Sequence, residues 1–579
     1  MEDLQIEGSG LRVSPDRFLE RLCTYSIVEM LLLGSIWSAQ IGTSSVTFYV
    51  MLVSVALLVS LVLTLNTTRT EQFVLLCATT LLLRLIVPLA KPASVVDNFP
   101  DAYVLRNDIL FIMKHGTSST DTASSSYRYY PGASFLLTML SLATGIGIDP
   151  VLKYFPVILI LPIFGAIPIL VRALGFKDTH IEALAMAIVS FIPFLIGANP
   201  HASPFNFGTI LLFLALAFYF ESVVGSKTSY SILFALVVSA VVICSIIASI
   251  FLVLITGAFV VLTLLFRRSL EIRLGMNLFA FTVMTFLLWY LFPAIALSGN
   301  VVTALSHEMG PELRILTITT PTGLKPMWMV IEEYVAFLYF GLVLLGSLFG
   351  KSEGSRLPRL VAVSGILASI LFVTPWILGL STATELISRI LLIVSFVGAP
   401  IMAASLCSLR SICMKFGSVP IRLKIGVLMA GGLITLLVLN SVIYGMPTYY
   451  YDHSIPQQPE DTRGLEFWIA IGSYLSGTKP NSTIWGPRLG ATFVGEYAQA
   501  QYYQFVVPTT RGQIVAIEAA SFPSIAIKLR DQYVLISKSM DAVPEAPGYL
   551  PNIEIPLSSC TRIYDNGELV LLVAYAPAQ

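Results

Sequence analysis

The chain has 579 residues, of which 56% are hydrophobic and only 12% are charged, and its 34 basic and 34 acidic residues give a net charge of zero. Soluble domains carry about 25% charged residues, so this composition excludes a soluble globular protein and predicts an integral membrane protein. The balanced charge excludes the basic surface of a nucleic-acid-binding protein. The six cysteines form no CxxC pair, so neither a disulfide framework nor a zinc knuckle is expected.

About thirteen apolar runs follow one another along the chain, each near the roughly 20 residues that cross a bilayer. A spanning backbone must satisfy its own hydrogen bonds in lipid, so each run is predicted to be a helix. The predicted membrane helices are 22–40, 46–65, 72–90, 150–172, 182–198, 206–224, 229–246, 248–266, 275–297, 330–349, 360–380, 386–406 and 424–445. The apolar segment 132–147 is shorter, and we expect it to lie at the membrane interface, with a tilted span as the alternative.

The distribution of Lys and Arg predicts the orientation of these helices. Alternate short loops carry basic residues, such as Arg172, Lys227 and Arg267, whereas the loops between them, such as 199–205, carry almost none. The basic loops are expected on the cytoplasmic side. The N-terminus is then cytoplasmic and the C-terminal part lies outside, provided that 132–147 does not cross the membrane.

The chain is predicted to divide into a transmembrane domain, 1–445, and a small extracytoplasmic α/β domain, 446–579. Two long polar segments of the first domain, 91–131 and 298–329, are expected to be outer loops. In the C-terminal domain, the patterns predict a helix at 461–475 and strands at 482–486, 532–537 and 568–575. The pair Asn566-Gly567, between Arg562-Ile563-Tyr564 and the last strand, is typical of a type I′ hairpin turn.

The sharpest candidate site follows the third predicted helix. Arg84 lies inside the outer end of this helix, and Asp97 and Asp101 follow in the first outer loop. A charge at membrane depth is costly and usually marks a functional site. A carboxylate beside a cation can act as a general base. The alternative is that Arg84 extends to the interface and that both aspartates are ordinary loop acids.

Several short motifs occur in a distinctive order along the chain. They are the late Arg84, the loop with Asp101 and Tyr103, Tyr130-Pro131-Gly132, Arg172-Ala173-Leu174-Gly175, Ser388-Arg389-Ile390, and the ending from Arg562 to Glu568. Their order resembles that of the polyprenol-dependent glycosyltransferases of the GT-C fold. The similarity is to the protein mannosyltransferase and oligosaccharyltransferase-like families of prokaryotes, archaea above all, and it covers nearly the whole chain.

The resemblance implies an α-helical polytopic membrane enzyme of GT-C fold. Such an enzyme transfers a sugar, with inversion, from a polyprenyl- or dolichyl-phosphate donor to a glycan, lipid or protein acceptor at the outer face of the cell membrane. Asp101 then has the role of catalytic base, with Asp97 as the second candidate. Arg389 is the candidate for the donor phosphate, because a guanidinium matches phosphate oxygens. Arg84 and Tyr103 are further candidates for substrate binding.

Polar residues of other predicted outer loops are weaker candidates. His201, His307 and Glu308 are assigned to substrate binding, and His201 is also a candidate metal ligand, although each has an alternative as an ordinary loop residue. Mg²⁺ or Mn²⁺ is a candidate cofactor. The Trp-Trp-Asp signature of oligosaccharyltransferases and the adjacent Asp-Glu pair of protein O-mannosyltransferases are absent, which leaves the acceptor and the metal dependence open.

Two other functions compete with sugar transfer. One is a membrane transporter or a flippase of lipid-linked sugars, and the other is a catalytically inactive relative that binds such glycans. A transporter is expected to carry charges at the centres of its helices and to be built of repeated halves. Here acidic residues are almost absent from the helix centres, and the polar groups gather on one side, which favours chemistry at the interface.

Overall fold

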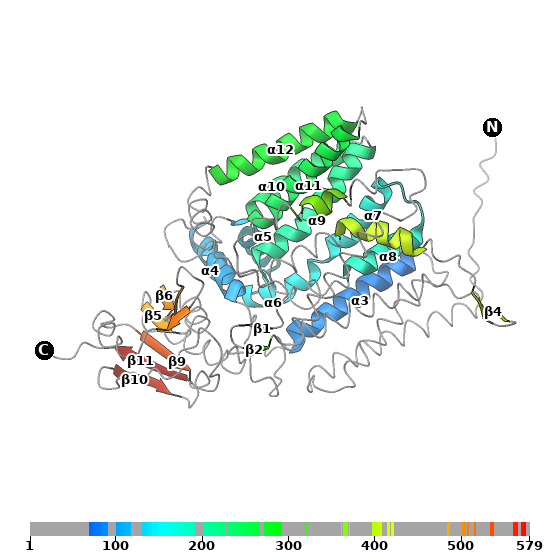
Figure 1. The fold of residues 1–579 in the computed structure, drawn as a ribbon. Coiled ribbons are helices and arrows are strands. Elements are labelled where there is room, and N and C mark those ends of the chain that lie inside the picture. Colours follow the sequence, from blue (N-terminus) through cyan, green and yellow to red (C-terminus); the bar gives the residue numbers. More distant parts are fainter. Residues whose placement is uncertain are drawn as a thin grey trace, which may run out of the picture.

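In a computed structural model of the chain, the described residues are 69–90, 100–116, 130–190, 202–225, 228–266, 271–291, most of 361–370, 396–407 and a set of short strands (Figure 1). Residues 396–407 form an apolar helix. The labelled helices are α3 (Arg69–Ala90), α4 (Pro100–His115), α5 (Gly132–Thr144), α6 (Ile148–Ile158), α7 (Leu161–Ala173), α8 (Thr179–Ser190), α9 (Pro204–Gly225), α10 (Thr228–Cys244), α11 (Ile246–Leu265) and α12 (Glu271–Leu291).

Four helices are long and apolar enough to cross a membrane, and they coincide with four predicted spans. They are Ile148–Ala173, which joins α6 and α7, and Pro204–Val224, Ile246–Leu265 and Ile272–Leu291. Shorter apolar helices overlap four further predictions, 72–90, 182–198, 229–246 and 386–406. The chain is therefore a multi-pass membrane protein. The predicted spans 22–40, 46–65, 330–349 and 424–445 lie outside the described residues, and 360–380 is described only in part.

The ends of the described helices gather into two groups. At one, which we call the α4 end, Tyr130 packs on Tyr290 of α12 with ring centroids 6.1 Å apart, and the Tyr290 hydroxyl donates to the carbonyl of Val242 near the end of α10. At the other, the Arg172 end, Arg172 closes α7 and lies 4.0 Å from the carboxylate of Glu182 in α8. This grouping agrees with the predicted alternation of the helices. Which end faces the outside remains a prediction.

Helix α5 begins at the α4 end, and the chain leaves α5 at the same end. A Cβ placed on Gly132 would lie 2.5 Å from Sγ of Cys244, so the start of α5 touches the end of α10. After α5, Gly145 adopts a left-handed conformation with φ of 69°, and the chain turns directly into α6. Thirteen residues extend only about 20 Å as a helix. This geometry agrees with the expectation that 132–147 does not cross the membrane.

At the α4 end of the bundle, the start of α9 packs closely against the start of α11. Ser245 caps α11, its hydroxyl accepting from the backbone N–H of Ala248, and Ser203 accepts in the same way from Asn206 at the start of α9. A Cβ on Gly208 would lie 2.3 Å from the Cβ of Ser245. The absence of a side chain at Gly208 therefore allows α9 to approach this cap.

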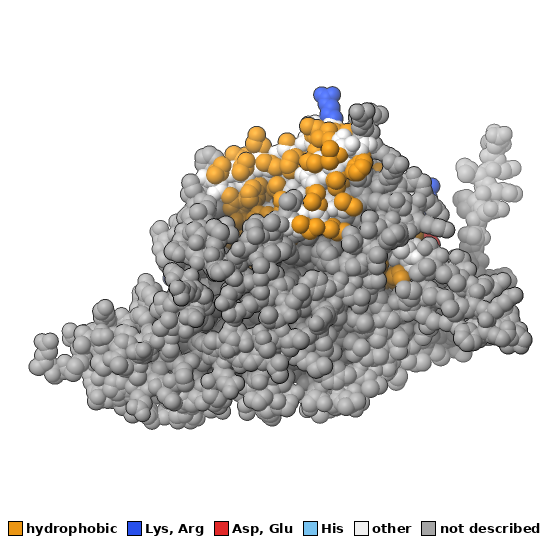
Figure 2. All heavy atoms as spheres, viewed as in Figure 1, with side chains coloured by type: hydrophobic (Ala, Val, Ile, Leu, Met, Phe, Trp, Pro, Cys, Tyr) orange, Lys and Arg blue, Asp and Glu red, His pale blue; other side chains and the backbone are white. Residues whose placement is uncertain are grey.

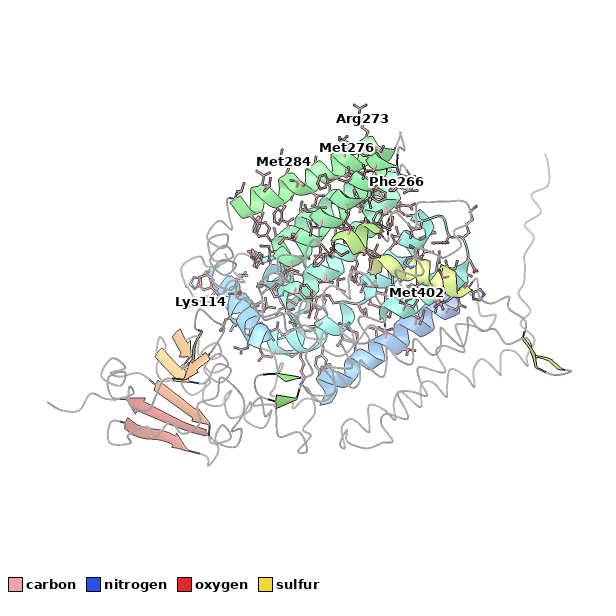
Figure 3. The ribbon with its side chains drawn as sticks, viewed as in Figure 1. Lys114, Phe266, Arg273, Met276, Met284 and Met402 are labelled. Atoms are coloured by element: carbon pink, nitrogen blue, oxygen red, sulfur yellow. The ribbon has the colours of Figure 1, made fainter. Side chains whose placement is uncertain are left out.

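Apolar side chains also cover part of the outer surface of the bundle. Figure 2 shows them over its upper part in this view, where α12 and its neighbours lie. On α12 the exposed apolar side chains are Met276, Phe281, Met284, Leu287, Leu288 and Leu291. Figure 3 shows Met276 and Met284 pointing away from the bundle. A surface of this kind is expected to face lipid.

Short strands occupy the C-terminal part of the sequence. One sheet has the order β10 (Cys560–Asp565), β11 (Leu569–Ala574), β9 (Tyr533–Ser537), β5 (Thr483–Gly486) and β6 (Gln501–Gln504). The three predicted strands coincide with β5, β9 and β11, and β10 pairs antiparallel with β11 as the hairpin prediction requires. The turn residues and the helix predicted at 461–475 lie outside the described residues, and the separate domain stays a prediction.

The remaining two-stranded sheets are β1 (Thr319–Thr320) with β2 (Gly323–Leu324), β3 (Met414–Phe416) with β4 (Val419–Ile421), and β7 (Val506–Pro508) with β8 (Ile514–Ala516).

Replacement of Gly208 tests the packing of α9 on α11. We expect Gly208→Ala to destabilise the protein by about 1–3 kcal/mol, because the new methyl group overlaps Ser245. Gly165→Ala, in the middle of α7, is the matched control, because a Cβ there meets nothing within 4 Å. Thermal unfolding in detergent measures both variants. Equal melting temperatures for Gly208→Ala and the parent would contradict this packing.

Single cysteines test the orientation. Lys114 at the end of α4 and Arg273 at the start of α12 are both exposed, at opposite ends of the bundle (Figure 3). In a background without the six native cysteines, we expect a membrane-impermeant maleimide to label Lys114→Cys on intact cells. Arg273→Cys should react only after the membrane is opened. The reverse pattern would invert the topology.

Candidate active site

The first turn of α4 carries two of the candidate residues. Pro100 is the first residue of this helix, a position where its missing N–H costs nothing, and Asp101 and Tyr103 follow it. The positive end of the helix dipole favours a carboxylate at this place. The side chains of Asp101 and Tyr103 lie outside the described part of the structure, so only the backbone of these residues is placed.

Helix α4 packs through a single apolar face. Ala102, Leu105, Ile109 and Ile112 are buried at the three- and four-residue spacing of one helix side, and Asp108 is buried next to them. Asp101 precedes Leu105 by four residues and Asp108 by seven. These positions share one side of an α-helix, so the backbone of Asp101 lies on the side that faces the bundle.

Arg84 of α3 is completely enclosed by the protein. Only 1% of its side chain is exposed, and its Nη2 donates a hydrogen bond of 2.8 Å to the carbonyl of Pro156. Pro156 lies in the last turn of α6, where carbonyl groups lack a helical partner and carry partial negative charge. The sequence-based alternative, in which Arg84 extends to the interface, is therefore wrong for the side chain described here. Arg84 joins α3 to the break between α6 and α7.

Arg106 of α4 forms an ion pair with Asp149 of α6. Its Nε lies 2.6 Å from Oδ1 of Asp149, and the two side chains are 18% and 46% exposed. Asp149 belongs to the first turn of α6, where the helix dipole also favours its negative charge. The sequence carries no local signal of this pair, because 43 residues separate its members.

Lys153 lies between these two contacts on the same side of α6. Asp149, Lys153 and Pro156 are spaced by four and three residues, which aligns them along one side of the helix. Lys153 is only 6% exposed although it carries a charged amine. We call the set Arg84, Arg106 and Lys153 the α6 cations. Lys153 was not predicted as a site residue either, although the sequence shows a lysine at the start of an apolar run.

The α6 cations bring three basic side chains to this part of the site. Three basic side chains from three helices gather along the seven-residue distance from Asp149 to Pro156, about 10 Å of helix. The described acids beside them are Asp149, which is paired, and the buried Asp108. Charges at low dielectric interact more strongly than in water, so the groups that pair with these side chains have a large effect here.

A buried phenol borders the same end of the bundle. Tyr130, just before α5, is enclosed against Tyr290. Burial raises the pKa of the Tyr130 phenol well above its usual range. Tyr130 therefore contributes a neutral hydroxyl and an aromatic surface rather than a charge.

The remaining candidates of the sequence analysis fall outside the described residues. These are Asp97, His201, Arg389, His307 and Glu308. Among the residues that the structure does describe, no three His, Cys, Asp or Glu side chains gather into a group that could hold a metal ion. A role for Mg²⁺ or Mn²⁺ stays a prediction that depends on the other residues.

The sequence matches no protein-family model and no curated protein. The fold, however, is similar to that of solved membrane glycosyltransferases. ArnT from Cupriavidus metallidurans bound to undecaprenyl phosphate matches 88% of this chain and 100% of its own, with a TM-score of 0.51 and 11% identity. The apo state of ArnT matches 88% of this chain and 99% of its own, with a TM-score of 0.51 and 12% identity.

A second enzyme gives a similar result. Arabinofuranosyltransferase AftD from Mycobacteria matches 89% of this chain with a TM-score of 0.52 and 13% identity, and this chain covers 40% of AftD. At these identities the likeness concerns the fold. The protein has the GT-C fold of membrane glycosyltransferases, as its sequence motifs predicted.

Truncation of Arg84 tests its place in the structure. We expect Arg84→Ala to lower stability by at least about 1–3 kcal/mol, because the buried Pro156 carbonyl loses its donor and a cavity remains. Thermal unfolding in detergent measures the change, with Arg273→Ala, an exposed arginine of α12, as the control. Equal melting temperatures for Arg84→Ala and the parent would contradict a buried bond.

Proposed function

We propose that the protein is an inverting glycosyltransferase that moves a sugar from a polyprenyl-phosphate donor to an acceptor at the α4 end of the bundle. The observation that carries this proposal is the GT-C fold over 88% of the chain. The position of Asp101 adds support, because its helix, α4, is joined through Arg106 to α6, the helix of the buried Lys153. By the distribution of basic loops, the α4 end is the outer face of the cell membrane.

In the proposed reaction Asp101 is the general base. Its carboxylate takes the proton from the acceptor nucleophile while that atom attacks the anomeric carbon of the donor sugar. The attack comes from the face opposite the phosphate, so the configuration at this carbon inverts. A carboxylate in the first turn of α4 suits this role, because the helix dipole favours its ionised form. Asp97 is the second candidate.

The leaving group is the polyprenyl phosphate. The bond between the anomeric carbon and the phosphate oxygen breaks, and the oxygen keeps the electron pair, so negative charge grows on the phosphate. Cations placed there in advance stabilise that charge most strongly where water is excluded. Arg389 is the candidate from the sequence, and Lys153 is the described cation that we add to it. The lipid in the ArnT structure, undecaprenyl phosphate, supports a donor of this class.

Tyr103, His201, His307 and Glu308 are proposed to contact the donor sugar or the acceptor from the loops of the α4 end. A glycan, a lipid or a protein hydroxyl or amide all supply the nucleophile that this chemistry needs.

Asp101→Asn tests the proposal. Removal of the base is expected to abolish sugar transfer while the amount of protein in the membrane stays the same, because Asn fits the same helix position. Asp178→Asn is the matched control: Asp178 accepts from the backbone N–H of His180 before α8, near the Arg172 end, and Asn can cap a helix as well as Asp.

The measurement is mass spectrometry of surface glycans from cells with the parent, with each variant and without the protein. The same comparison identifies the sugar and the acceptor. Unchanged glycans in Asp101→Asn would remove Asp101 from the mechanism. Loss of solute uptake with intact glycans in cells without the protein would favour a transporter instead.

A further inference from the structure

The pair Arg106–Asp149 is a polar link between α4 and α6. Nε of Arg106 and Oδ1 of Asp149 are 2.6 Å apart, a short and directional contact between a planar guanidinium and a carboxylate. Helix α4 also packs through its apolar face, formed by Ala102, Leu105, Ile109 and Ile112. Apolar packing is not directional, so it restricts the rotation and sliding of a short helix less than an ion pair does.

We propose that Arg106 and Asp149 are positioning residues, which set the place of the first turn of α4 for sugar transfer. The inference rests on the proposed function, because the pair affects sugar transfer by positioning Asp101, the proposed base. Arg106 follows Asp101 by five residues, about 7.5 Å along one continuous helix. A shift or rotation of α4 at Arg106 therefore moves the backbone of Asp101 as well.

The surroundings of Asp149 favour a stable pair. Asp149 lies in the first turn of α6, whose dipole favours its charge, and α6 is itself tied to α3 by Arg84 at Pro156. The charged side chains that share this region are Lys153 on α6 and Asp108 on α4. Arg106 thus links α4 to a helix that a second arginine holds in place seven residues further on.

The test is a double-mutant cycle with Arg106→Ala, Asp149→Ala and both together. Displacement of a catalytic group by about 1 Å can cost on the order of 100-fold in rate, so we expect kcat to fall about 10- to 100-fold in either single variant. The donor KM should change much less, because the α6 cations other than Arg106 remain. The double variant should be no worse than either single variant, since both remove one interaction. The exchanged pair, Arg106→Asp with Asp149→Arg, should recover most of kcat.

A second measurement does not depend on activity. Hydrogen exchange of the α4 backbone, residues 100–115, is expected to become faster in both single variants and to slow again in the exchanged pair. Arg172→Ala breaks the described pair with Glu182 at the Arg172 end and is the matched control, with exchange in α4 and kcat unchanged. If Asp149→Ala does not accumulate in the membrane, Asp149→Asn weakens the same contact with almost no change in size.

The outcomes separate this inference from the proposed function. Unchanged exchange in α4 would overturn the tie between α4 and α6, whether or not the protein transfers sugar. Faster exchange with unchanged kcat would overturn the positioning role, while sugar transfer itself would stand. A parent protein without sugar transfer, in which the substitutions still release α4, would overturn the proposed function and the positioning role together.

Discussion

The arrangement of the site depends on one buried guanidinium. Arg84 lies among apolar helices with almost no contact to solvent, so its charge must be satisfied inside the protein. The carbonyl of Pro156 is available because α6 ends two residues later, before α7 begins. The break between α6 and α7 therefore supplies the acceptor for the arginine of α3. This hydrogen bond holds α6 in place, and α6 in turn holds α4 through Asp149.

The contacts of α3 and α4 with α6 give the candidate site both its shape and its charge. Arg84 and Arg106 reach α6 from two different helices, and Lys153 stands between their contacts on the same side of α6. The three side chains bring basic groups to this side of α6 and give it positive charge. In the proposed reaction this charge suits a phosphate leaving group, and the first turn of α4 suits a base.

Among the described residues, the apolar runs predicted the apolar helices well, because a backbone in lipid has few alternatives to the helix. The interfacial position of 132–147 was predicted from its short length and from the charge pattern, and it stays a prediction. Arg84 was found because a charge interrupts an apolar run, but its partner is a main-chain carbonyl, which sequence cannot indicate. Arg106 and Asp149 were missed because their contact depends on how α4 and α6 pack together. Lys153 was missed because its burial depends on the helices packed around it, which the sequence does not give. The parallel pairing of β5 with β6 was not predicted either, since parallel strands lack the local signal of a hairpin turn.

The buried face of α3 also bears on how the protein enters the membrane during synthesis. Gln72, Thr79, Thr80 and Arg84 all lie on this face, and each is at most 1% exposed. An arginine at the centre of a helix costs roughly 2.5–3.5 kcal/mol during insertion by the translocon. Arg84, toward the C-terminal end of α3, adds part of this cost to that of the polar groups beside it, which disfavours partition of α3 alone into lipid. Its partners α6 and α8 follow it in the chain by more than fifty residues. The nascent α3 is therefore expected to wait at the translocon, or at the bilayer surface, until α6 emerges and offers Pro156 to Arg84.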